Sequence, residues 1–68
     1  MQAAEEAVAH IAYDEAHEKL FVRFAGGHEH MYVGVPAEVH RSFAETDRKD
    51  HFFLEEVSGY YLYNRLPV

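Results

Sequence analysis

The sequence predicts an α+β fold: a three-stranded antiparallel β-meander, two short helices and an extended C-terminal tail. From Lys19 to Phe24, every second residue (Leu20, Val22 and Phe24) is apolar, which is the period of a strand with one buried face. Gly26-Gly27 follow and favour a hairpin, because glycine accepts positive φ without steric cost. Beyond Pro36, apolar residues recur four positions apart, as on one face of a helix.

The three predicted strands follow from the period of two. Val8 to Tyr13 forms the first, and the polar segment Asp14 to Glu18 forms a turn. In the second strand, Lys19 to Phe24, the two faces carry Leu20, Val22 and Phe24 on one side and Lys19, Phe21 and Arg23 on the other. His28 to Val33 returns as the third strand, and Gly34 ends it.

The hairpin between the second and third strands admits two registers, and a slip of one residue exchanges the faces. A three-residue loop, Ala25 to Gly27, pairs Val22 with His30 and Leu20 with Tyr32. His30 and Tyr32 then point into the core. We favour this register because so small a core needs the aromatic bulk.

The alternative is a two-residue loop at Gly26-Gly27. It pairs Arg23 with His30 and Phe21 with Tyr32, which places all four side chains on the face away from Leu20. Such an aromatic and basic surface would suit the stacking of bases or of a peptide.

The first predicted helix opens at Pro36, whose missing N–H has no partner in a first turn anyway. Val39 and Phe43 form its buried edge, since they lie four residues apart. Thr46 to Lys49 breaks the helix. A helical cover is needed here, because a sheet of three strands is too small to be stable alone.

A second short helix is predicted to begin with Asp50 as its cap. Phe53 and Val57 are again four apart and would face the sheet. Gly59 is a natural helix stop. Tyr60 to Leu66 then runs extended as a docked tail.

Size and composition limit the chain to a single domain. We predict a flexible leader over residues 1–7 and one domain over residues 8–68. There is no cysteine, so neither a disulfide nor a thiolate site is expected. No long apolar run suggests a membrane span or a signal peptide, and the expected location is the cytoplasm.

The charge balance does not favour strong nucleic-acid binding. The net charge is −6, from 12 acidic and 6 basic side chains, whereas nucleic-acid binders usually present a basic face to the phosphates. Only Arg48 and Lys49 are adjacent basic residues. A local basic face remains an alternative.

An ordered set of short motifs spans about residues 8 to 66. It comprises Tyr13-Asp14, Phe24, Gly27, Tyr32, Val35-Pro36, Phe52-Phe53, Val57, Tyr61, Tyr63 and Arg65-Leu66. This set resembles the KTSC domain, a small module named from the C-terminus of some lysyl-tRNA synthetases and also found alone in bacteria. The resemblance implies an RNA-binding function, which has been suggested for the family.

The chain departs from the family pattern at four positions. His30 stands in place of the first tyrosine of a Tyr-x-Tyr pair. Arg48, Asp50 and Leu54 stand where the pattern has Ser, Gly and Asn. Three of these departures lie in or beside the segment before the second helix, so an activity that the family places there would be altered.

His28 and His30 are weak candidates for a metal site. Residues two apart on a strand point the same way, which is a usable ligand spacing. A structural zinc site needs four ligands and a catalytic one needs three. His10 could join them only if its strand lay in the right register, so we expect no metal and no cofactor.

Candidate binding residues fall into three groups of aromatic and basic side chains. These are Arg23, His30 and Tyr32 in the hairpin, Arg48 and Lys49 in the loop, and Tyr61, Tyr63 and Arg65 in the tail. Tyrosine and arginine are enriched at binding hot spots and can stack on bases. Each group also has a purely structural interpretation, as core packing or as a solvated loop.

We expect no catalysis. Ser42 lies two residues from His40, but residues two apart on a helix do not face one another. The favoured function is therefore a non-catalytic binding module acting in protein interaction, with a protein partner or a second copy paired to a free sheet edge. RNA, including tRNA, is the alternative partner, and no membrane is expected.

Overall fold

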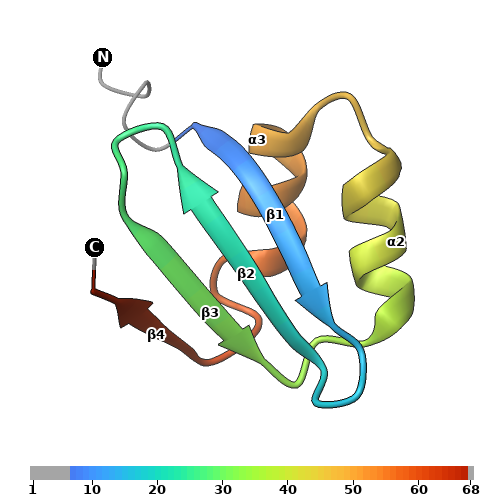
Figure 1. The fold of residues 1–68 in the computed structure, drawn as a ribbon. Coiled ribbons are helices and arrows are strands. Elements are labelled where there is room, and N and C mark those ends of the chain that lie inside the picture. The colour runs from blue at the N-terminus through green and yellow to red at the C-terminus, as the bar shows by residue number, and fades with distance from the viewer. Residues whose placement is uncertain (1–6, 68) are drawn as a thin grey trace.

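A computed structural model describes residues 7–67 as an antiparallel sheet with two short helical segments against one face, which confirms the α+β fold (Figure 1). Its elements are β1 (Val8–Asp14), β2 (Lys19–Phe24), β3 (Glu29–Val33), α2 (Ala37–Glu45), α3 (Lys49–Phe52), the π-helical turn η1 (Phe53–Val57) and β4 (Tyr63–Leu66). Most of the predicted leader, residues 1–6, lies outside the described residues. No helix within residues 7–67 is long and apolar enough to span a membrane.

The β2–β3 hairpin adopts the three-residue loop. Leu20 lies opposite Tyr32 and Val22 opposite His30, as we predicted. The Phe24 N–H donates to the His28 carbonyl at 2.9 Å, and the loop closes at Gly27, whose φ of 101° suits glycine. The alternative surface therefore does not form, because Arg23 lies on the opposite face of the sheet from His30.

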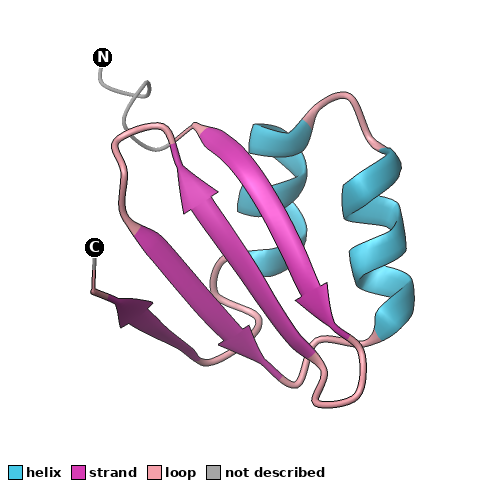
Figure 2. Cartoon of the chain, in the orientation of Figure 1, coloured by secondary structure: helices cyan, strands magenta, loops and turns pink. Residues whose placement is uncertain are grey.

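The C-terminal tail is a fourth strand, which corrects the three-stranded prediction. The strand order is β1-β2-β3-β4, and β4 runs antiparallel to β3 with Tyr63 opposite Tyr32 (Figure 2). Gly59, with φ of 87°, lies in the turn before β4. The tail pairs with the sheet because the outer edge of β3 carries backbone N–H and C=O groups that need partners, and the returning tail supplies them.

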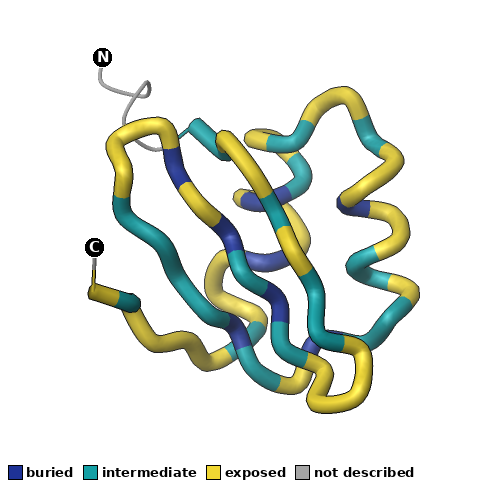
Figure 3. Tube along the Cα trace, viewed as in Figure 1, coloured by how far each residue is buried: buried dark blue, intermediate teal, exposed yellow. Residues whose placement is uncertain are grey.

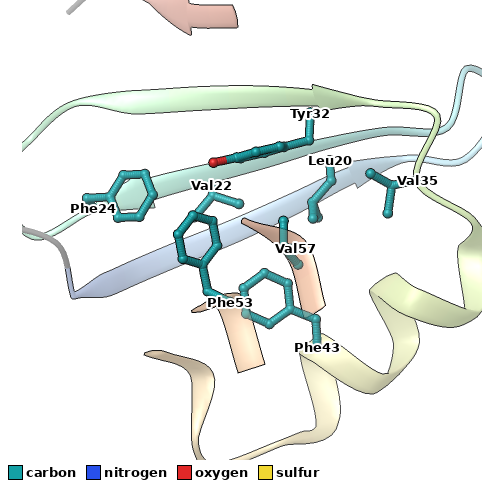
Figure 4. Packing of buried hydrophobic residues seen from close by; sticks show 8 residues of the cluster. All are labelled: Leu20, Val22, Phe24, Tyr32, Val35, Phe43, Phe53 and Val57. Atoms are coloured by element: carbon teal, nitrogen blue, oxygen red, sulfur yellow. The ribbon is translucent and has the colours of Figure 1, made fainter. Parts of the chain in front are cut away.

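The core lies between β2 and the helices. Leu20, Val22 and Phe24 are at most 3% exposed and alternate with outward residues (Figure 3). Phe43 from α2 and Phe53 from η1 meet them from the other side (Figure 4). Removal of this apolar surface from water is the main stabilising contribution in a chain of this size.

Two polar side chains of the α2–α3 region have structural functions. The prediction that Asp50 caps the second helix is wrong, because α3 begins one residue earlier, at Lys49, with Arg48 as its cap. Its Oδ1 instead accepts a hydrogen bond from the Val8 N–H at 2.8 Å, which ties the start of β1 to α3. The Lys49 ammonium donates to the carbonyl of Thr46 at 2.7 Å, where it satisfies the end of α2.

Candidate functional site: an aromatic groove

A groove of about 640 Å³ lies on the helix side of the sheet, beneath β3 and β4. The helices lie toward the β1 side, whereas β4 forms the opposite margin (Figure 1). Phe24, His30 and Tyr32 line the groove from the sheet, and Phe53 and Leu54 line it from η1. The segment from Ser58 to Tyr63 closes its far side. We call this feature the aromatic groove.

Exposed apolar surface is concentrated at this groove. Within residues 7–67, four large apolar side chains are exposed: Leu54 (63%), Tyr60 (67%), Leu62 (81%) and Tyr63 (52%). All four line the groove. Single exposed apolar residues are common, but a set gathered around one concavity is typical of an interaction site.

The sheet side of the groove is a continuous cluster of rings. Phe24 contacts the rings of His28 and His30, with centroids 5.0 and 4.9 Å apart. His30 stacks on Tyr63 at 4.5 Å and 26°, which joins β3 to β4. Phe53 meets Phe24 edge to face from below at 5.3 Å. These packed rings hold the cluster in one geometry.

Tyr32 and His30 form the polar pair of the cluster. The Tyr32 hydroxyl oxygen lies 3.1 Å from the Nδ1 atom of His30. Burial raises the pKa of Tyr32 to about 12, with Tyr63 adding to the effect, so the phenol keeps its proton at neutral pH. Burial, followed by the nearby His28 and Arg65, lowers the pKa of His30. We therefore assign the phenol as donor to Nδ1 of a neutral imidazole, with the ring hydrogen on Nε2.

The η1 segment shapes the lower wall. The Ser58 N–H donates to the Phe53 carbonyl at 2.8 Å, a hydrogen bond between residues five apart that widens this turn. Phe53 and Val57 remain buried, while Leu54 lies at the groove with its side chain largely exposed. Single π-turns within helices are frequent at functional sites.

The structure brings together about half of the predicted binding residues. His30, Tyr32, Tyr61 and Tyr63 all line the groove, and Arg65 lies opposite His30 on β4. Arg23, Arg48 and Lys49 lie elsewhere. Arg23 faces Glu29 on the face of the sheet that the helices do not cover, which we call the open face. Their charged groups are 3.8 Å apart.

The two histidines considered for a metal line the same groove. The rings of His28 and His30 are 5.6 Å apart. His10 is opposite Arg23 across β1 and β2, so it belongs to the open face and does not approach them. Within residues 7–67, no group of three or more metal-ligating side chains is present.

Sequence reasoning missed Phe53, Leu54 and Leu62 as groove residues. Phe53 was expected only in the core, and it serves both purposes. The available signal was the pair Leu54 and Leu62, which are apolar residues outside the predicted buried faces. Only their convergence in space makes that signal meaningful.

The fold and the groove define a small α+β domain with a four-stranded antiparallel sheet and an aromatic groove at one margin. A sequence profile of the KTSC domain matches residues 4–61, and the chain belongs to this family. A crystal structure of a KTSC domain protein from Yersinia pestis shares the fold, with a TM-score of 0.83 and 28% sequence identity over 88% of this chain and 84% of that chain. No curated protein matches the sequence.

Proposed function

We propose that this KTSC domain is a non-catalytic protein-interaction module whose aromatic groove takes an apolar side chain from a partner segment. The observation that carries the proposal is the gathering of Leu54, Tyr60, Leu62 and Tyr63 around one concavity. Burial of such a patch by a partner removes apolar surface from water, and tyrosine is enriched at binding hot spots.

The partner segment is expected to be basic around its apolar anchor. The chain carries 12 acidic and 6 basic side chains, so its field attracts positive charge.

RNA is the second candidate, and the distribution of basic residues supports it less. Stacked rings such as His30 and Tyr63 suit bases, but phosphates need converging cations. Arg65 is the one predicted basic site residue beside the groove. Lys49 is bound to the end of α2, and Arg23 lies on the other face.

A peptide-display selection on the immobilised domain tests the proposal. The expected result is enrichment of peptides with an aromatic or leucine anchor flanked by Lys or Arg. Their binding should be lost in the double variant Leu54→Ser/Leu62→Ser and kept in the control Met31→Ser, which alters the opposite face of β3. No enrichment, or equal binding to the double variant, would refute a groove-binding function.

The same samples distinguish RNA from protein. In a nitrogen–proton NMR titration with mixed tRNA, RNA binding predicts saturable shifts at low salt that shrink steeply as salt is raised. That result would replace the protein-binding proposal if the display selection also failed.

A further inference from the structure

The outer side of β4 is an open strand edge. Within residues 7–67 the sheet ends at β4, whose far side faces away from β3 (Figure 1). A strand edge carries free N–H and C=O groups that can pair with another strand. Which residues present those groups follows from the hydrogen bonds to β3.

The β3–β4 ladder directs the backbone of Tyr63 and Arg65 outward. The Val33 N–H donates to the Leu62 carbonyl at 3.0 Å, in line with the register that opposes Met31 to Asn64. Hydrogen-bonded and non-hydrogen-bonded pairs alternate along an antiparallel ladder. Leu62, Asn64 and Leu66 therefore bond to β3, whereas the two residues between them offer N–H and C=O to a new strand.

The two edges of the sheet differ in their protection. On β1, the register shifts between Val8 and His10, and this irregularity interrupts the edge. On β4, the register is continuous from Tyr63 to Leu66, and these residues include no proline and no lysine. Bulges, very short strands, charged side chains and proline are the usual devices that limit edge pairing. β4 has no bulge, and its protection consists of its length of four residues and one charged side chain, Arg65. β4 is therefore the more open of the two edges.

We propose that two copies of this chain associate by antiparallel pairing of their β4 strands, with the twofold axis at Asn64. In this register, Tyr63 of each copy pairs with Arg65 of the other, and both outward residues of each strand are used. The two sheets join into one continuous sheet. Because the axis is perpendicular to the sheet, both aromatic grooves lie on the same face, one on each side of the join.

The side chains are self-complementary in this register. Tyr63 lies opposite Tyr32 and Arg65 opposite His30, so both side chains occupy the helix-side face of the sheet. Each Tyr63 ring then meets the guanidinium of the other copy's Arg65, which is a favourable cross-strand cation–π pair formed twice. A shift by two residues would instead oppose arginine to arginine or tyrosine to tyrosine.

The charge of the chain makes this association dependent on salt. Each copy carries a net charge of −6, so two copies repel at long range. Screening reduces that repulsion, and the association should strengthen as salt is raised. This dependence is opposite in sign to that of RNA binding.

Sedimentation equilibrium from micromolar to millimolar concentration tests the proposal. We expect a weak monomer–dimer equilibrium that tightens with salt. Arg65→Glu should raise its Kd about tenfold, since it removes both cation–π pairs and places a carboxylate beside each Tyr63 ring. The matched control Arg23→Glu makes the same charge change on the open face of β2 and should have a smaller effect.

Isotope-filtered NMR on a mixed labelled and unlabelled sample tests the register directly. It should show contacts between the Asn64 α-hydrogens of the two copies and between the Tyr63 ring and the Arg65 side chain. A strict monomer at millimolar concentration would overturn the proposal. So would a dimer whose intermolecular contacts lie away from β4, or equal effects of Arg65→Glu and Arg23→Glu.

Discussion

Replacement of Tyr32 by alanine probes the hairpin register and the core together. The Tyr32 side chain is 2% exposed, and its ring packs against Phe53 at 5.8 Å and Tyr63 at 5.1 Å. Truncation of a buried aromatic ring costs about 3–5 kcal/mol, from lost burial and the cavity left behind. A chain of this length has a total stability of about 3–10 kcal/mol, so Tyr32→Ala removes a large part of it.

Tyr32→Phe separates the hydroxyl from the ring. It removes only the hydrogen bond to His30 Nδ1, at 3.1 Å, and should cost about 1 kcal/mol. Tyr60→Ala is the matched control, because Tyr60 is 67% exposed and its truncation should change the stability by less than about 0.5 kcal/mol.

Urea denaturation followed by circular dichroism at neutral pH measures all three variants. With a slope of about 1 kcal/mol/M, a loss of 3 kcal/mol lowers the midpoint by about 3 M. The expected order of stability is wild type, Tyr60→Ala, Tyr32→Phe and then Tyr32→Ala. If Tyr32→Ala kept the wild-type midpoint, Tyr32 would not be a core residue and the three-residue hairpin loop would be the wrong register.

Three further predictions concern polar groups. Stability should fall as pH rises from about 10 to 12, by at most about 2–3 kcal/mol from Tyr32, because its phenol ionises later when folded than when unfolded. Tyr13, whose pKa burial also raises, acts in the same direction, so Tyr32→Phe should reduce this loss in urea titrations without abolishing it. As pH falls below about 6.5, the free energy of unfolding should decrease. The pKa of His30 is lower in the folded chain, so the unfolded chain binds the proton first. His30→Gln should weaken that dependence, and an unchanged slope would contradict it. Asp50→Ala should speed hydrogen exchange of the Val8 amide, which Asp47→Ala should leave unchanged.

The local elements were predictable because their determinants are local. The alternation from Lys19 to Phe24 matches β2 residue for residue, and Pro36 marks the start of α2 to within one residue. Asp50 was misassigned for a non-local reason. Its carboxylate has a preferred partner in the Val8 amide, which is 42 residues away along the chain.

The candidate binding site was only partly predictable. Tyr61 and Tyr63 were identified by residue type, and they line the groove. Arg23 was grouped with His30 only in the register that does not form, since the two side chains lie on opposite faces. Leu54 and Leu62, taken one at a time, are only weak signals of function, because a single exposed leucine is common on protein surfaces.

The sequence by itself determined the fold class, the family, three strands, the two helical segments and most of the core, since period, turn residues and chain length act locally. Only the tertiary structure decided whether the C-terminal tail pairs with the sheet. Whether Tyr63 to Leu66 remains extended or pairs as β4 depends on the free edge of β3, which is distant in sequence. The aromatic groove exists because that pairing places Tyr63 beside His30 and opposite the residues of η1.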